Sequence, residues 1–228
     1  MDLHEPTHFC IFAEQVSSQS PKGTYLSRKE LGVFDNYLMM LLTSAIFFLF
    51  AHLVTAWNPG TKQSTLSRIV LTVAGTAYLA MAGVVAWDPK VPLFMIRYAD
   101  WLVTVPIMTW QLVKLMGVKP SASYVASVVS AFIMLALGLA GDMGVWHRTW
   151  LGVFSTVFFF YIFISLADHV NKGNAKIFVS QAAIWSFYGI AYFTPSKEGI
   201  IAFCCADIAA KVGLAVMANR KPEATDVA

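Results

Sequence analysis

Charged side chains are scarce in this sequence. They make up 13% of its 228 residues, while 57% are hydrophobic. A soluble domain is typically about 25% charged. The mean hydropathy is +0.63. A composition this poor in charge argues against an ordinary soluble globular protein and favours one whose solvent is the lipid bilayer.

Cysteine is also rare, and its scarcity excludes a disulfide framework. The three cysteines are Cys10, Cys204 and Cys205, and the last two are neighbours in an apolar run, where packing is the usual role. The first 35 residues lack the basic start and the apolar middle of a signal peptide. His4, His8 and Cys10 have no fourth ligand at a recognisable spacing, so we interpret this segment as a polar external tail without a metal site. A formal net charge of +3 is too small to indicate a nucleic-acid partner.

Seven apolar stretches are long enough to cross a bilayer, which takes about 20 residues of helix. They are joined by short segments with turn-forming residues such as Asn58, Pro59 and Gly60. No alternating pattern of the β-barrel type is present in the sequence. The sequence therefore predicts an all-α, seven-helix transmembrane bundle, with spans at 36–57, 69–87, 92–116, 121–141, 149–167, 177–195 and 199–218.

Basic residues are distributed unevenly between the two ends of these stretches. One side carries eight basic and three acidic residues, and the opposite side carries six basic and eight acidic residues. Because the side richer in Lys and Arg faces the cytoplasm, the N-terminus is expected outside the cell membrane and the C-terminus inside. The predicted organisation is an extracellular segment 1–35, a membrane domain 36–219 and a cytoplasmic tail 220–228.

Four charged residues remain inside the spans: Arg97, Asp100, Asp207 and Lys211. Such a group costs about 2.5–3.5 kcal/mol or more at the bilayer centre, so it faces the bundle interior and finds partners. Asp207 lies one helical turn before Lys211, and Arg97, Asp100 and Thr104 share a face of the third span.

Two interpretations of these charges compete. The first is a structural cluster of ion pairs, which is poorly motivated because desolvation offsets the attraction between buried charges. The second is that Lys211 is a desolvated amine suited to Schiff-base chemistry with an aldehyde, with the two aspartates as counterions.

Aromatic residues accompany the charges. Trp185, Tyr188 and Tyr192 are spaced three and four apart, so they share one helix face. Trp101 and Tyr78 lie on two other spans. An aromatic stripe alone is more often core packing, but beside a lysine in the middle of the membrane it favours a slot for a flat apolar chromophore.

At these residues the chain resembles the microbial (type 1) rhodopsins of the proteorhodopsin and xanthorhodopsin kind, and the resemblance extends over all seven spans. The third span contains RYADWLVTVP (97–106), and the seventh contains ADIAAKVG (206–213). The sixth span contains WSFY (185–188) and YFT (192–194). Each segment resembles the corresponding helix motif of that family.

The resemblance implies all-trans retinal bound covalently to Lys211. It implies Asp100 as primary counterion and proton acceptor, and Asp207 as second counterion. It further implies that Arg97 gates the exit side and that Thr104 and Gln111 line the proton pathway. The implied retinal pocket consists of Tyr78, Trp101, Met108, Met134, Gly138, Phe159, Trp185, Tyr188 and Tyr192.

Departures from the family pattern concern the transported ion. Outward proton pumps of the family usually carry a carboxylate eleven residues after the counterion, where this chain has Gln111, which cannot ionise. Sodium pumps carry a carboxylate at the position of Thr104, and chloride pumps lack one at the position of Asp100. Ala77 stands where proteorhodopsins have histidine, and Gly189 where a sixth-helix proline is expected.

Gly152 matches the position where xanthorhodopsin has glycine beside its carotenoid antenna. The resemblance therefore raises a carotenoid as a second cofactor. The alternative interpretation is ordinary packing of helices through a small residue.

Three functions are consistent with the sequence, and none of them is an enzyme. The first is a light-driven outward proton pump with slow reprotonation through Gln111, which Glu198 supports as a candidate carboxylate on the release side. The second is a sensory photoreceptor that signals through a separate transducer, which slow reprotonation without a carboxylic donor would suit. The expected lack of a C-terminal signalling domain supports the first. The third, a membrane scaffold or transporter without photochemistry, is disfavoured by Lys211. The resemblance also implies a homo-oligomer, either a trimer or a pentamer.

Overall fold

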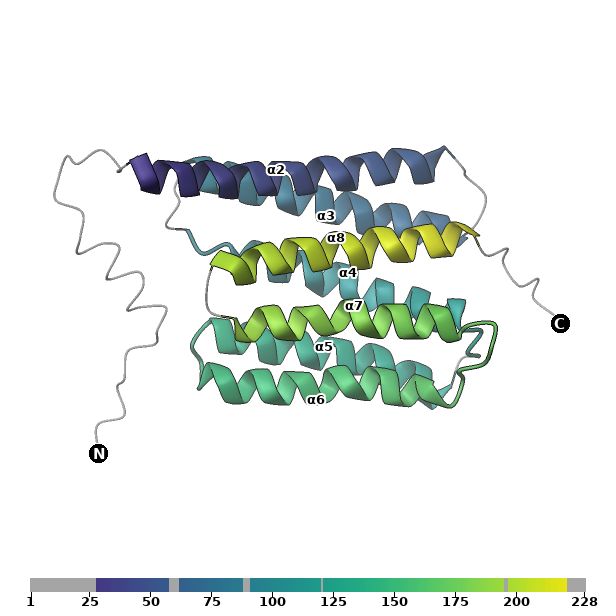
Figure 1. The fold of residues 1–228 in the computed structure, drawn as a ribbon. Helices are drawn as coiled ribbons and strands as arrows, with labels where there is room; N and C mark the ends of the chain where they lie inside the picture. The colour runs from purple at the N-terminus through teal and green to yellow at the C-terminus, as the bar shows by residue number, and fades with distance from the viewer. Residues whose placement is uncertain (1–27, 58–61, 88–90, 120, 195–196, 221–228) are drawn as a thin grey trace, which may run out of the picture.

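The structure is a computed structural model that describes residues 28–57, 62–87, 91–119, 121–194 and 197–220, with side chains for 36–57, 64–87, 91–119, 121–194 and 201–219. The described residues form one bundle of roughly parallel and antiparallel helices (Figure 1). There are seven of them: α2 (Arg28–Ala56), α3 (Lys62–Trp87), α4 (Phe94–Leu115), α5 (Ala122–Asp142), α6 (Arg148–Ala167), α7 (Ala175–Phe193) and α8 (Lys197–Arg220). The predicted all-α seven-helix architecture is confirmed.

Helix bounds differ from the predicted spans mainly at polar ends. α2 begins at Arg28 rather than at residue 36, so the end of the predicted external segment is helical. α3 begins at Lys62 rather than at residue 69. The physical reason is that hydropathy reports only the part of a helix in hydrocarbon, whereas backbone hydrogen bonding continues into the polar interface.

A glycine with a left-handed backbone conformation follows each of two helices, α4 and α5. Gly117 has φ +74° after α4, and Gly144 has φ +70° after α5. The backbone N–H of the next residue donates back to the last turn, from Val118 to Val113 at 3.2 Å and from Val145 to Ala140 at 3.0 Å. This left-handed cap satisfies carbonyls that would otherwise end unpaired, and glycine adopts it without strain.

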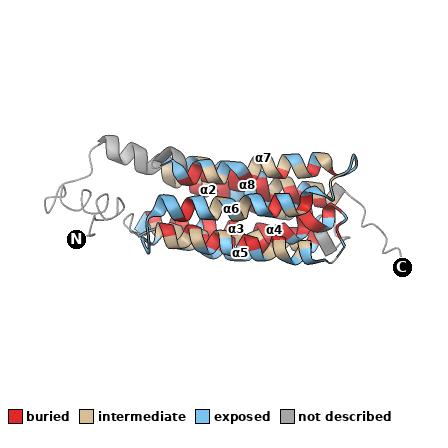
Figure 2. Ribbon diagram, turned by 90° about the horizontal axis from the view of Figure 1, so that it is seen from below, coloured by how far each residue is buried: buried red, intermediate tan, exposed pale blue. Residues whose placement is uncertain are grey.

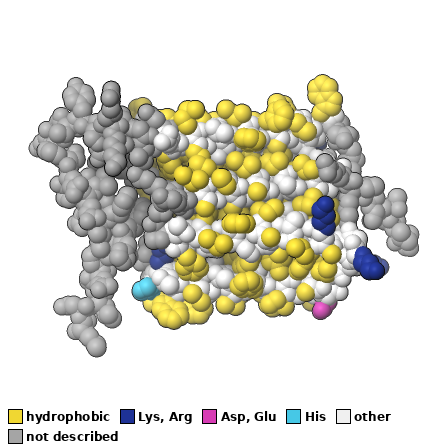
Figure 3. Space-filling view, viewed as in Figure 1, with side chains coloured by type: hydrophobic (Ala, Val, Ile, Leu, Met, Phe, Trp, Pro, Cys, Tyr) yellow, Lys and Arg dark blue, Asp and Glu magenta, His cyan; other side chains and the backbone are white. Residues whose placement is uncertain are grey.

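The surface and the interior are inverted relative to a soluble protein. Large apolar side chains cover the middle of the face shown in Figure 3, and charged side chains gather toward its two ends. Buried residues line the inside of the bundle (Figure 2) and include the charged Asp100, Asp207 and Lys211, which are at most 3% exposed. This pattern is that of a multi-pass membrane protein.

Five of the described helices contain an apolar stretch long enough to span a membrane: α2, α3, α5, α6 and α8. The other two, α4 and α7, carry more polar side chains along their length. In α4 these include the buried Asp100, Thr104 and Gln111, and in α7 the buried Gln181. These buried polar side chains face the bundle interior, which is where a site can be built.

Helix packing places α4 and α8 face to face at the centre. Successive helices are neighbours along the chain, and α8 closes the arrangement by packing against α2, α3, α4 and α7. The third and seventh predicted spans, which carry the four internal charges, are thereby brought together.

Candidate functional site

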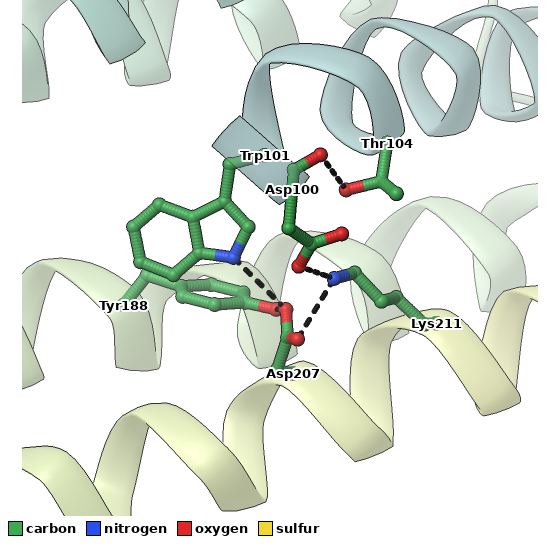
Figure 4. Close-up of polar contacts among 6 residues, drawn as sticks. All are labelled: Asp100, Trp101, Thr104, Tyr188, Asp207 and Lys211. Carbon is green, nitrogen blue, oxygen red and sulfur yellow. Dashed lines mark hydrogen bonds and ion pairs between the residues drawn. The ribbon is translucent and has the colours of Figure 1, made fainter. Parts of the chain in front are cut away.

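The centre of the site is an ion cluster between α4 and α8, shown in Figure 4. Lys211 Nζ lies 2.5 Å from Asp100 Oδ2 and 2.8 Å from Asp207 Oδ2. The lysine side chain is 0% exposed, and the aspartate side chains are 1% and 2% exposed. Asp207 and Lys211 meet because they are one turn apart on α8, and Asp100 is supplied by α4. One amine and two carboxylates thus share a site that is buried from bulk solvent.

The two carboxylates are held differently. Asp207 Oδ1 accepts a hydrogen bond from the Tyr188 hydroxyl at 2.7 Å and one from Trp101 Nε1 at 3.2 Å. Asp100 Oδ1 is buried and has no hydrogen-bond partner among the described residues. Asp207 is therefore restrained by α4, α7 and α8 together, whereas Asp100 retains capacity to accept a proton or a further hydrogen bond.

Thr104 and Arg97 lie one turn on either side of Asp100 on α4. The Thr104 hydroxyl donates to the Asp100 backbone carbonyl at 3.0 Å, so it stays within its own helix. The Arg97 guanidinium carbon lies 4.7 Å from the centre of the Phe203 ring and 5.9 Å from that of Trp101. These cation–π contacts place a positive charge beside the ion cluster, and with it the four internal charges sum to zero.

Most of the predicted pocket residues lie in two adjoining hydrophobic clusters. Trp101 contacts Tyr188 edge to face, with ring centres 5.4 Å apart. Trp185 and Met108 are buried in the neighbouring core cluster, against which Phe159, Met134 and Tyr188 also pack. Tyr192, buried, packs in the same cluster as Trp101. Tyr78 lies apart from them, against Phe48 in the cluster formed by α2, α3 and α8.

Phe48 and Phe203 are site residues that the sequence analysis missed. Lys211 Nζ lies 5.6 Å from the centre of the Phe48 ring, which is fully buried. Phe203 is 5.5 Å from the Trp101 ring. The sequence could have indicated Phe203. It lies four residues before Asp207 and eight before Lys211, so all three share one helix face. Nothing in the sequence singles out Phe48 among the apolar residues of α2.

Gln111 and Gln181 are buried polar residues in the half of the bundle nearer the predicted cytoplasmic loops. Gln111 is buried and its Nε2 donates to Ser67 Oγ at 2.9 Å. Gln181, also missed from the sequence, is fully buried, and neither amide atom has a partner within the described part of the chain. It lies one turn before Trp185, whose buried Nε1 likewise has none there. Unpaired buried polar groups of this kind are commonly satisfied by internal water.

Aromatic side chains approach closely at Gly138 and Gly152, because these residues have no Cβ. A Cβ at Gly138 would lie 2.7 Å from the Tyr98 hydroxyl. A Cβ at Gly152 would lie 2.9 Å from Phe193 Cζ and nearer still to the Tyr192 ring. The space beside Gly152 thus holds rings of α7, an arrangement that fits the packing interpretation of this glycine without a carotenoid.

We expect Gly152→Ala to lower the stability of the folded protein by about 1–3 kcal/mol, the usual effect of overpacking a core. Gly83 provides the matched control, because a Cβ there meets no atom within 4 Å, and Gly83→Ala should be neutral or slightly stabilising in a helix. The measurement is the thermal unfolding midpoint of both variants. Equal midpoints would show that Tyr192 and Phe193 move aside without cost.

Glu198 lies outside the residues whose side chains the structure describes. Asp168 and His169, at the end of α6, are exposed. The site residues that the structure does bring together are therefore those of α4, α7 and α8 around Lys211.

A protein-family model, several protein sequences and several solved structures resemble this chain. A family model of bacteriorhodopsin-like proteins matches residues 33–221. Sensory rhodopsin III of Haloarcula marismortui is 31% identical over 175 residues, which cover 70% of this chain and 74% of that protein. The bacteriorhodopsin-II-like protein of Haloquadratum walsbyi is 26% identical over 65% of this chain and 72% of its own length. The crystal structure of the light-driven proton pump rhodopsin of Coccomyxa subellipsoidea has the same fold, with a TM-score of 0.69, 21% identity and coverage of 82% of this chain and 96% of that one.

The family match includes all four internal charges, the six helices α3 to α8, and α2 from residue 33 onward. It agrees with the motifs around Asp100 and Lys211 and with the burial of both residues. The chain therefore belongs to the bacteriorhodopsin-like family of microbial rhodopsins, multi-pass membrane proteins that bind retinal.

Proposed function

We propose that this protein is a light-driven outward proton pump, and not an enzyme, that carries all-trans retinal covalently on Lys211. The observation that carries the proposal is the unequal restraint of the two carboxylates beside Lys211. Asp207 accepts hydrogen bonds from Tyr188 and Trp101, whereas Asp100 Oδ1 has no partner among the described residues. An acceptor within hydrogen-bond distance of a proton-bearing nitrogen is the geometry that general acid–base chemistry requires.

The residues around Lys211 fit a long, flat and apolar aldehyde. The amine is fully buried, and aromatic rings of Trp101, Trp185 and Tyr188 lie on the adjoining faces of α4 and α7. When bound through a Schiff base, retinal supplies visible absorption and a light-driven change of shape. The protein supplies the two carboxylates that neutralise the protonated nitrogen and the rings that restrict the chromophore.

Proton movement away from the light-absorbing site would use Asp100 first. Asp100 lies 2.5 Å from Lys211 Nζ, so a proton can pass without intervening water. Once the proton is on Asp100, Lys211 and Asp100 are both neutral and Asp207 keeps its negative charge; Arg97, one turn nearer the N-terminal end of α4, would balance that charge and is placed on the side toward which the proton would leave. With the N-terminus outside, as the distribution of basic residues predicts, that direction is outward.

Return of a proton to Lys211 would be slow. Gln111 cannot ionise, and it donates its amide proton to Ser67. The buried amide of Gln181 and the indole of Trp185 both offer hydrogen-bonding capacity between the level of Gln111 and that of Lys211. We infer a path of internal water along these groups that draws protons from the cytoplasm without a resident carboxylic acid.

Gln111→Glu should therefore speed recovery of the visible absorption band after a flash. In the unsubstituted protein we expect recovery to slow about tenfold per pH unit above neutrality, because the proton must come from bulk water, whereas a positioned acid supplies it locally. Flash photolysis between about pH 6 and 9 measures both rates. Gln111→Leu is the control, since it removes the bond to Ser67 without adding an acid. A recovery that is already fast and independent of pH would contradict the missing donor, and the exposed pair Asp168 and His169 would be tested next.

The direct test of pumping is illumination of unbuffered cells or oriented vesicles while the external pH is recorded. Acidification of the medium by cells, abolished by a protonophore, supports outward pumping. Light responses without any pH change favour the second candidate, a sensory photoreceptor with a separate transducer. Two observations favour that candidate: the lack of an ionisable donor at Gln111, and the 31% identity to sensory rhodopsin III.

A further inference from the structure

A groove between α2 and α3 lies apart from the Lys211 site. It has a volume of about 320 Å³ and is lined by His52, Thr65, Arg68, Ile69, Thr72 and Val73. Thr65 and Thr72 are exposed, and Ile69 is 42% exposed. The groove therefore opens on the outer, lipid-facing side of the bundle rather than toward its centre.

Arg68 supplies a positive charge to the lining of this groove. Its Nη2 donates to Thr65 Oγ1 at 3.2 Å, and its buried Nε has no hydrogen-bond partner in the part of the chain that the structure describes. No carboxylate of the described residues forms an ion pair with it. An arginine stays charged at every physiological pH, so a buried, unpaired guanidinium N–H requires an acceptor, and an anion satisfies it best.

His52 stands opposite Arg68 across the groove. Its Nδ1 lies 3.0 Å from Thr72 Oγ1 and 3.4 Å from the Arg68 carbonyl oxygen. The Thr72 hydroxyl also donates to that carbonyl, at 2.8 Å. These contacts hold the imidazole of α2 against α3. The polar lining of the groove therefore includes His52 from α2 and the cationic Arg68 from α3.

The groove lies near the end of α2 and the start of α3, where a helix that spans the membrane meets the lipid headgroups. Arg68 lies six residues into α3 and His52 four residues before the end of α2, which corresponds to about 9 Å and 6 Å along the helices. The end of α2 and the start of α3 are consecutive in the chain, so both residues lie near the same end of the bundle. A cation at this depth extends its charged group toward the headgroups.

We propose that this groove binds the phosphate group of an anionic phospholipid. Arg68 provides the charge-assisted hydrogen bonds, and Thr65 and His52 provide further polar contacts. Ile69 and Val73, one turn apart along the same wall, would contact the first carbons of an acyl chain. The groove is at the end of the bundle that carries the excess of basic residues, and the cytoplasmic leaflet is the one rich in anionic lipid.

The test is native mass spectrometry of the detergent-purified pigment with added phosphatidylglycerol or phosphatidylcholine. We expect one phosphatidylglycerol to be retained with about fivefold preference, which corresponds to about 1 kcal/mol for one basic residue at the membrane surface. Arg68→Gln should abolish the preference, and Arg68→Lys should keep part of it. Lys114→Gln, which removes an exposed charge in the last turn of α4, is the matched control and should retain it.

The visible absorption band serves as the folding check for every variant. If Arg68→Gln fails to form pigment, His52→Gln and Arg68→Lys decide the question, because each should weaken the preference while the groove remains. Equal retention of both lipids by the unsubstituted protein would overturn the proposal, as would an unchanged preference in Arg68→Gln. Displacement of the lipid by millimolar inorganic phosphate would also overturn it, since the groove would then recognise a free anion.

Discussion

Replacing Lys211 with alanine should abolish the visible absorption band that the unsubstituted protein forms with retinal. Lys211 is the only lysine buried among the described residues, and its Nζ is the atom that both carboxylates face. The loss should be complete, because every other lysine whose side chain the structure describes is exposed. The measurement is absorption after reconstitution, followed by borohydride reduction and a search for a covalent adduct after denaturation.

Stability must be followed in the same experiment. Lys211→Ala leaves Asp100 and Asp207 buried together without their cation, which typically costs about 3–5 kcal/mol. The double variant Lys211→Ala/Asp100→Asn removes one of those charges and should recover part of the stability while remaining colourless. Lys114→Ala, on the exposed side of α4, should keep the band. A borohydride-trapped adduct in Lys211→Ala would show that retinal is attached elsewhere.

Replacing Asp100 with asparagine should shift the absorption band to longer wavelength and reduce light-driven proton transport by about 10²-fold or more, the size of effect seen when a positioned acid or base is removed. The shift follows because Asp100, 2.5 Å from Nζ, stabilises the positive nitrogen in the ground state, and an amide does not. Spectra and vesicle pH recordings measure the two effects. Acidification of the unsubstituted protein should reproduce the red shift, since protonation removes the same charge, and Asp100→Asn should not respond.

Asp207→Asn is the informative comparison. Asp207 accepts hydrogen bonds from Tyr188 and Trp101 as well as from Lys211, and asparagine would accept them without the negative charge, so its replacement weakens the bonds that tie α8 to α4 and α7 while leaving the acceptor Asp100 in place. We expect a smaller loss of transport and a larger loss of thermal stability than in Asp100→Asn. The reverse ranking, with an unchanged spectrum in Asp100→Asn, would assign the main counterion to Asp207.

Gly152 illustrates how the structure bears on an interpretation that the sequence left open. Its small size is consistent with two explanations, an opening for a carotenoid or close helix packing. The positions of the α7 rings favour the second, because a Cβ at Gly152 would lie 2.9 Å from Phe193 Cζ and nearer still to the Tyr192 ring. Arg148 adds to this contact, with its guanidinium carbon 4.3 Å from the Tyr192 ring centre and a hydrogen bond of 2.7 Å to the Tyr192 carbonyl.

Local chemistry was readable from the sequence alone. Long apolar runs predict helices because a helix satisfies its own backbone within the membrane, and a glycine such as Gly117 predicts where one ends. The pairing of Asp207 with Lys211 follows from one turn of helix, and so does the common face of Arg97, Asp100 and Thr104. These features depend on residues within about one turn of each other, whose geometry the helix itself sets.

Only the tertiary structure decided how the helices are rotated and which faces meet. Asp100 reaches Lys211 across 111 positions of the chain, and Tyr188 and Trp101 converge on Asp207 from two different helices. The partnership of Gln111 with Ser67, the contact of Phe48 with Lys211 and the groove at Arg68 are of the same kind. Such contacts result from many small packing interactions summed over whole helices, so no local pattern in the sequence records them.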